Sequence, residues 1–138
     1  MGHSGKIVRM DLTPPFALAV ADAVLTPDEL DPEQIVSGEP RVSSAVLHES
    51  PATEPGGRVV ERGVWEITPG VVTDVEADEV FVVLAGRGTV TFEDGEVVTL
   101  APGVAVRLRA GERTTWVVTE TLRKVYQITY VPGADEAA

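Results

Sequence analysis

The stretches GVWEITPGVVTDVEADEVFVVLAG, residues 63–86, and GEVVTLAPGVAVRLRAGERTTW, residues 95–116, decide the fold of this chain. Apolar and polar residues alternate along both stretches, and Pro-Gly pairs interrupt the alternation. A period of two predicts β-strands with one buried face, and the Pro-Gly pairs predict the turns between them. These stretches therefore predict an all-β protein.

The same alternation continues on both sides and predicts about nine short strands. They are residues 41–49, 59–68, 71–75, 79–85, 89–92, 96–100, 104–109, 114–118 and 125–131. Short strands with turn signals about every ten residues are typical of β-sandwiches and barrels. The glycine-rich residues 86–88 lie between two strands with no helix after them, so we interpret them as a turn and not as a phosphate-binding loop.

The region before the first of these strands differs in pattern. We interpret residues 1–40 as an N-terminal arm, residues 41–131 as the barrel and residues 132–138 as a tail. Residues 7–10 could form a short strand, and residues 16–25 either a strand or a short helix. Thr26-Pro27-Asp28-Glu29 has a capping residue, a proline and two acids, so we expect one or two helical turns there, ending at Pro32.

Composition limits the class of protein and its partners. The chain has 138 residues, no cysteine and a formal net charge of −11. This length suits one domain, and the absence of cysteine excludes disulfides, thiolate metal sites and thiol nucleophiles. The acidity opposes binding to nucleic acid or to anionic membrane surfaces. We find no apolar signal segment and no membrane-spanning run, so we expect a cytoplasmic protein.

Several motifs carry a resemblance to a known family. They are Gly63-Val-Trp-Glu, Pro69-Gly70, Asp78-Glu79, Leu84-Ala-Gly-Arg-Gly-Thr-Val, Asp94-Gly95, Pro102-Gly103, Ala110-Gly111, Trp116 and Arg123-Lys-Val-Tyr126. On these motifs the chain resembles a small single-domain cupin, an RmlC-like double-stranded β-helix. Within the cupins it is most similar to the branch of the (S)-ureidoglycine aminohydrolase cupin domain. The resemblance covers about residues 38–130 and implies a jelly-roll barrel and a homodimer.

The metal-binding motifs of cupins are largely missing. Metal-binding cupins carry His-x-His, then three or four residues, a glutamate, six residues and a glycine, and a later third histidine. Glu79 and Gly86 keep the final spacing, but counting back places Val75 and Thr73 at the first two histidines, and Thr114 stands at the third. One carboxylate with a threonine and a valine cannot hold a divalent transition metal. We therefore predict no metal and no cofactor.

Glu79 and Tyr126 are the candidate catalytic residues. The resemblance implies a set of metal ligands in the aminohydrolase, and this chain keeps none of them, whereas Tyr126 matches a pocket tyrosine of that enzyme. Glu79 shares the parity of Phe81 and should point into the barrel. There it is either a desolvated general acid or base, or a carboxylate held by hydrogen bonds at the start of a strand.

Five residues are candidates for contacts with a small ligand. They are Trp65, Phe81, Thr114, Trp116 and Tyr126. The aromatic ones could stack on a planar or sugar-like molecule that Glu79 orients, or they could be core or dimer packing. The sequence thus leaves three hypotheses: a metal-independent small-molecule-binding cupin, an enzyme of the aminohydrolase type, and a structural barrel filled by its own side chains.

The remaining charged residues near these strands are expected on the outside. Arg107 and Arg109 share one face of a strand. If that face were inward they would form a receptor for an anion, but we favour an outward face paired with the abundant acids. We interpret Glu76 and Asp78 as turn residues.

Overall fold

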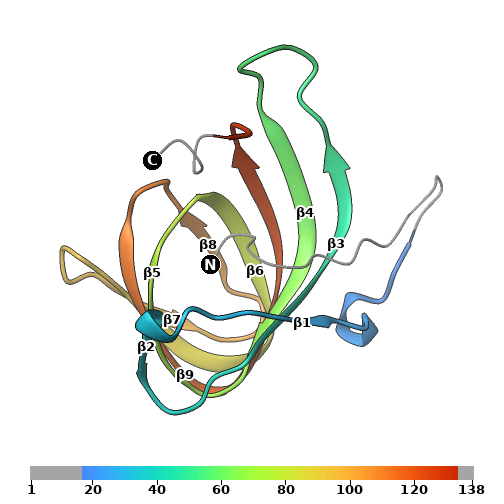
Figure 1. The fold of residues 1–138 in the computed structure, drawn as a ribbon. Coiled ribbons are helices and arrows are strands. Elements are labelled where there is room, and N and C mark those ends of the chain that lie inside the picture. The colour runs from blue at the N-terminus through green and yellow to red at the C-terminus, as the bar shows by residue number, and fades with distance from the viewer. Residues whose placement is uncertain (1–16, 134–138) are drawn as a thin grey trace.

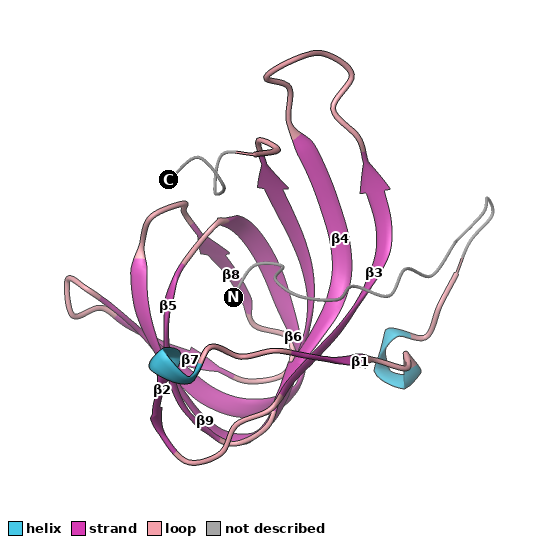
Figure 2. Cartoon of the chain, viewed as in Figure 1, coloured by secondary structure: helices cyan, strands magenta, loops and turns pink. Residues whose placement is uncertain are grey.

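Nine β-strands curl into one antiparallel sheet in the computed structural model, which describes residues 17–133 (Figure 1). The strands are β1 (Thr26–Asp28), β2 (Ile35–Ser37), β3 (Val42–Ser50), β4 (Val59–Ile67), β5 (Gly70–Val75), β6 (Asp78–Phe92), β7 (Val97–Leu100), β8 (Ala105–Leu108) and β9 (Arg113–Tyr130). Two 3-10 helices, η1 (Val20–Asp22) and η2 (Pro32–Gln34), precede the long strands (Figure 2). The prediction of an all-β barrel is confirmed.

Two long strands, β6 and β9, organise the sheet by pairing with each other along their whole length. In layer A, residues 122–130 of β9 pair with β4, and residues 79–82 of β6 pair with β8. In layer B, residues 113–118 of β9 pair with β5, and residues 88–91 of β6 pair with β7. Strands β3 and β1 extend layer A beyond β4, and β2 extends layer B beyond β5. The result is a jelly roll of two connected layers.

Glycine allows β6 to bend from one layer to the other. Gly86 has a φ of 95°, and a Cβ added there would collide with the carbonyl oxygen of Thr121. A Cβ at Gly88 would collide with the carbonyl oxygen of Val117. The predicted turn at residues 86–88 is therefore wrong: β6 bends there through shifts in register between residues 83 and 88, and its pairing with β9 continues on both sides. Similarly, residues 114–118 and 125–130, predicted as parts of two strands, belong to one strand, β9, which ends one residue before the predicted end at residue 131.

The arm contains two strands that join the barrel. The expected helix at Thr26 is wrong, because residues 26–28 form β1 and pair with residues 42–44 of β3. A capped 3-10 turn instead begins after Asp31, whose Oδ1 accepts a hydrogen bond from the Glu33 amide at 2.9 Å. Residues 16–25 hold the short helix η1, and the strand expected at residues 7–10 lies outside the described residues.

Arg123 fixes the arm to the outside of layer A. Its Nη1 donates to the carbonyl oxygens of Val20, Ala21 and Ala23 at 2.9–3.1 Å, and its Nε contacts Glu66 Oε1 at 3.0 Å. One guanidinium thus closes the carbonyl end of η1 and joins it to β4 and β9. Guanidinium can do this because its donors form a rigid planar fork.

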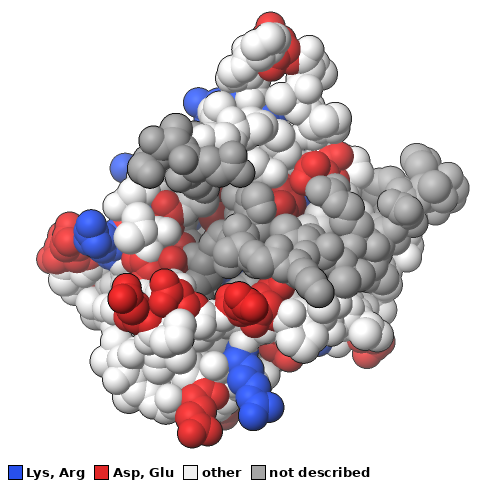
Figure 3. Space-filling view, viewed as in Figure 1, with Lys and Arg blue, Asp and Glu red and all other residues white. Residues whose placement is uncertain are grey.

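The hydrophobic core lies between the two layers. It consists of Val42, Trp65, Ile67, Val72, Phe81, Val83, Val90, Leu100, Val106, Leu108, Trp116, Val118, Leu122, Tyr126 and Ile128. Outside the core, acidic side chains are spread over the face seen in Figure 3, as the net charge of −11 leads one to expect. Among residues 17–133, no helix has the length and apolarity needed to cross a bilayer.

Candidate functional site

Polar side chains occupy part of the inner face of layer A. The register places Trp65 opposite Lys124, and Tyr126 between Gly63 on β4 and Phe81 on β6. Because side chains alternate along a strand, residues two apart on these strands face the same side. Because of this alternation, acidic, basic and aromatic side chains lie together in one interior cluster.

A buried ion pair lies at the centre of the cluster. Lys124 Nζ is 2.6 Å from Glu79 Oε2, and each side chain is 1% exposed. Glu79 therefore enters the barrel as predicted, but its partner is a lysine, which neither interpretation of Glu79 included. Such a pair is costly to break, because the remaining charge would be buried without compensation.

Three aromatic rings surround the Lys124 ammonium. Its Nζ lies 4.5 Å from the Phe81 ring centroid, 4.6 Å from that of Trp65 and 5.1 Å from that of Trp116. Trp116 meets Trp65 edge-on at 5.9 Å and Phe81 at 5.6 Å. The rings supply cation–π attraction on the sides that Glu79 leaves open. Three of the four predicted aromatic contacts are thus brought together, and they surround a side chain of the protein itself.

A second polar pair lies beside the ion pair. Tyr126 donates its hydroxyl to Glu61 Oε2 at 2.8 Å, and Glu61 is 1% exposed. Burial raises the pKa of Tyr126 far above its ordinary value, and the nearby Glu61 carboxylate raises it further. A Cβ at Gly63 would lie 2.5 Å from the Tyr126 hydroxyl oxygen, so glycine is needed for the ring to fit. Tyr126 is consequently a neutral hydrogen-bond donor.

Glu76 forms a third polar group with two residues of β9. Its Oε2 accepts hydrogen bonds from Thr114 Oγ1 at 2.6 Å and from Trp116 Nε1 at 3.1 Å. Glu76 lies in the connection between β5 and β6, as expected of a turn residue, but its side chain is 4% exposed and bonds to buried residues. Asp78 does stabilise a turn, because its Oδ1 accepts from the Ala110 amide at 3.0 Å.

Asp28 brings a fourth carboxylate from the arm. Its Oδ2 accepts a hydrogen bond from Ser44 Oγ at 2.5 Å, while its Oδ1 is buried with no hydrogen-bond partner in the described part of the chain. Burial raises the pKa of Asp28, and the Ser44 hydrogen bond offsets part of this increase. The charge of Asp28 also contributes to the raised pKa of Tyr126.

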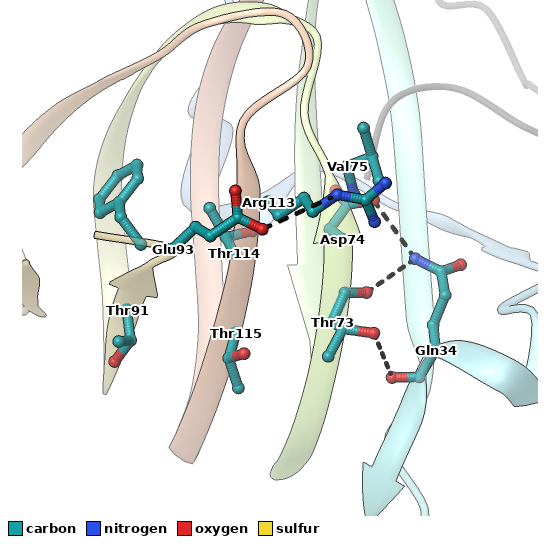
Figure 4. Close-up of a pocket in the computed structure, with 10 residues that line it drawn as sticks. Gln34, Thr73, Asp74, Val75, Thr91, Glu93, Arg113, Thr114 and Thr115 are labelled. Atoms are coloured by element: carbon teal, nitrogen blue, oxygen red, sulfur yellow. Dashed lines mark hydrogen bonds and ion pairs between the residues drawn. The ribbon is translucent and has the colours of Figure 1, made fainter. Parts of the chain in front are cut away.

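A separate cavity, the outer groove, lies against layer B and has a volume of about 620 Å³ (Figure 4). Its lining residues are Gln34, Thr73, Asp74, Val75, Thr91, Phe92, Glu93, Arg113, Thr114 and Thr115. All five predicted ligand contacts lie in the interior cluster or beside it, and Thr114, whose hydroxyl bonds to Glu76, also borders this groove.

A family model identifies the family of this chain. The family model of the EutQ-like cupin domain matches residues 54–126, about half of the chain. This chain belongs to the EutQ-like cupin domain family. No protein of curated function matches it.

Several solved structures resemble this one in fold. A protein of unknown function from Pseudomonas syringae pv. tomato superposes with a TM-score of 0.67 and 28% identity, covering 78% of this chain and 45% of that chain. The EutQ protein of Clostridium difficile gives 0.53 and 20%, covering 67% and 64%. A cupin superfamily protein from Desulfitobacterium hafniense gives 0.51 and 16%, covering 68% and 82%. This cupin thus spans less than half of the Pseudomonas protein and less than two thirds of EutQ.

The metal-ligand positions of cupins do not converge in this member. Val75, counted as a histidine position, is 54% exposed, and Thr73 shares its outward parity on β5. Along β5 the even-numbered Val72 faces inward, whereas along β6 the odd-numbered Glu79 does, because residues 76–77 connect the two strands. Residues 73 and 75, counted back from Glu79 in steps of two, therefore lie on the outer face. Among residues 17–133, no cluster of three or more His, Cys, Asp or Glu could hold a metal. The donor set does not fit a cupin metal, because an ammonium already occupies the inner side of Glu79.

The sequence prediction missed three residues of the cluster, Lys124, Glu61 and Asp28. Lys124 alternates with Leu122 and Tyr126, and this pattern already places it on the buried face. Glu61 sits between inward positions of β4 in the same way. Asp28 was missed because the sequence predicted a helix, and not the strand β1, at residues 26–28. Arg107, in contrast, is exposed on the outward face of β8, as favoured from the sequence, and Arg109 is also exposed.

Proposed function

We propose that this cupin is a metal-independent protein that binds a small organic molecule in its barrel. The observation that carries the metal-independent part is the ion pair between Glu79 and Lys124, which three aromatic rings enclose. In the metal-binding motif, a glutamate at this place meets the metal cation. Here the Lys124 ammonium supplies the positive charge, so a divalent ion would have to displace a buried cation that Glu79 and three rings stabilise.

The ligand site we propose is the polar end of the cluster, where the charge of Asp28 contributes to the raised pKa of Tyr126. Support comes from the buried Asp28 Oδ1, an acceptor without a donor among the described residues. An unsatisfied buried acceptor is costly, and a ligand donor would remove that cost. The ligand class is therefore an organic molecule with a hydroxyl, amide or amine hydrogen. Tyr126, as a neutral phenol committed to Glu61, positions the ligand and does not ionise.

Elemental analysis tests the metal-independent part. The full chain is purified without chelator, desalted and analysed for Mn, Fe, Ni and Zn, before and after incubation with each metal. We expect far less than one metal ion per chain in every sample. One tightly held metal per chain would contradict the proposal.

Native mass spectrometry tests the ligand. We expect the protein purified from cells to carry one small organic molecule, and Asp28→Asn to lose it, because the acceptor oxygen becomes a donor or is reoriented. Thr89→Val, on the outer face of β6, is the matched control and should keep the molecule. Identical spectra with no bound molecule in any sample would contradict ligand binding.

The same spectra bear on a second candidate, a structural barrel filled by its own side chains. Support for this candidate is the burial of Trp65, Phe81, Trp116 and Lys124 against one another, each at most 3% exposed. It predicts that no ligand is bound and that no small molecule raises the melting temperature.

The aminohydrolase branch of the cupins has weaker support. Tyr126 lies near Glu79, as that type of enzyme requires, but Glu79 Oε2 is bound to Lys124. This candidate predicts ammonia release from small ureido or amino compounds, lost in Glu79→Gln. Homodimer formation likewise stays a prediction, to be checked by light scattering on the eluting protein.

A further inference from the structure

The outer groove has a row of three threonines on neighbouring strands. Thr73 on β5 pairs in register with Thr115 on β9, and Thr115 with Thr91 on β6. The residues next to them, Val72, Trp116 and Val90, are fully buried in the core. The threonine side chains therefore point away from the core into the groove (Figure 4).

The hydroxyl groups of this row are open to a ligand. Adjacent strands lie about 4.8 Å apart, so the row is an evenly spaced line of hydroxyls. Thr73 Oγ1 contacts the Gln34 carbonyl oxygen at 3.4 Å. Within residues 17–133, the hydroxyls of Thr91 and Thr115 make no hydrogen bond. Each hydroxyl can both donate and accept.

Gln34 forms a fixed wall on one side of the groove. Its Nε2 donates to the Thr73 carbonyl oxygen at 3.0 Å and to Asp74 Oδ1 at 3.3 Å. These contacts hold η2 against β5 (Figure 4). A wall held by two hydrogen bonds gives the groove a shape that exists before a ligand arrives, which lowers the entropic cost of binding.

The far end of the groove carries one charge of each sign. Arg113 Nε lies 3.9 Å from Glu93 Oε2, and the two side chains are 69% and 75% exposed. A long, exposed pair of this kind is weak, so both groups can turn to a ligand. Asp74 adds a second carboxylate to the lining, and its Oδ1 accepts hydrogen bonds from Gln34 Nε2 and from the Val75 amide. The charged side chains of the lining therefore carry one net negative charge, which disfavours anions, and the row of hydroxyls favours a ligand rich in hydroxyl groups. Val75 adds an apolar contact for carbon-bound hydrogens.

We propose that the outer groove is a second binding site, for a neutral, hydroxyl-rich small molecule such as a monosaccharide or cyclic polyol. The volume of about 620 Å³ is in the range of small-molecule sites. The row of hydroxyls, the fixed amide and the charged pair at the far end supply donors and acceptors along its length. This site faces away from the barrel interior and is independent of the ligand proposed there.

Calorimetric titration with D-glucose, D-ribose and myo-inositol tests the groove, with glycine betaine as a probe that lacks hydroxyls. We compare the wild type with the pair Thr91→Val and Thr115→Val, which keeps the shape and strand preference of the side chains. Thr89→Val is the matched control, since it lies on the same strand and face but outside the groove. Circular dichroism verifies that all variants are folded.

We expect saturable binding of at least one hydroxyl-rich probe and none of glycine betaine. The threonine pair should weaken binding by about tenfold or more, because two hydrogen bonds are lost. Thr89→Val should change binding by less than about twofold, and Asp28→Asn should leave it unchanged, which separates this site from the one inside the barrel. Absence of saturable binding for all three probes, or equal binding by the threonine pair, would overturn the proposal.

Discussion

The interior of layer A and the outer groove of layer B use polar side chains in opposite ways. Inside, Lys124 and Glu79 satisfy each other at 1% exposure, and Tyr126 donates to Glu61. Outside, the hydroxyls of Thr91 and Thr115 have no partner among the described residues. Burial makes a partner obligatory, whereas water satisfies an exposed group until a ligand arrives. Mutations should therefore cost stability inside and affinity outside.

The largest effect is expected for Lys124→Met. This change keeps the length and apolar character of the side chain but leaves Glu79 buried without its cation. Breaking a buried pair on one side costs about 3–5 kcal/mol, measured as the free energy of unfolding in denaturant.

The double variant Glu79→Gln with Lys124→Met is the control, because it removes both charges. It should recover much of the lost stability. If Lys124→Met alone costs less than about 0.5 kcal/mol, the interior is not organised around the pair.

An intermediate effect is expected for Arg123→Ala, which acts at the boundary between inside and outside. The variant removes the donors that hold three carbonyl groups of residues 20–23 and the contact with Glu66. We expect a loss of about 1–3 kcal/mol, concentrated in the arm, as faster amide exchange in residues 20–28. Arg123→Lys should recover little, because one ammonium cannot reach all four acceptors. Uniform exchange across the barrel would instead indicate a global role.

A smaller, pH-dependent effect is expected for Asp28→Asn. Burial raises the pKa of Asp28 above 3.8, its ordinary value, so the folded state binds this proton more tightly than the unfolded state. That contribution to stability is complete below pH 3.8 and is lost as pH rises through the folded pKa. Asp28→Asn should therefore gain stability relative to wild type as pH rises, measured by denaturation between about pH 4 and 7. A difference that is constant across this range would contradict the burial of this carboxylate.

The smallest effect on stability is expected for Thr91→Val with Thr115→Val. These side chains are partly exposed, so the unfolding free energy should change by less than about 0.5 kcal/mol. The same pair should abolish most probe binding in the outer groove. A large loss of stability would mean that the threonines hold the sheet together and are not free for a ligand.

The sequence predicted most of the strands because alternation is a local property. It failed where the outcome depends on pairing between distant segments. Two glycines in three residues are typical of a turn, so the sequence predicts one at residues 86–88. The pairing of β6 with β9 on both sides makes this segment a bend within one strand. Local alternation predicts that Lys124 is buried, but its partner Glu79 is fixed by the register of two strands far apart in the chain.

The candidate site was predicted in part for the same reason. The inward aromatic residues and Glu79 follow from the period of two, whereas the positions of Thr73 and Val75 depend on the connection between β5 and β6. The two residues of that connection change which alternate residues face inward. Counting residues along the motif does not reveal this change. The outer groove, which joins four separated segments, gives no signal in any one of them.

The most direct test of the central claim, that Lys124 is the cation of Glu79, is the ¹⁵N spectrum of the lysine ammonium groups. The chain has only two lysines, Lys6 and Lys124, so Lys6→Arg assigns the signals. The account predicts a Lys124 ammonium signal that is protected from exchange, shifted by the surrounding rings and unchanged by added Zn²⁺ or Mn²⁺. A rapidly exchanging Lys124, or one displaced by one equivalent of metal, would contradict it.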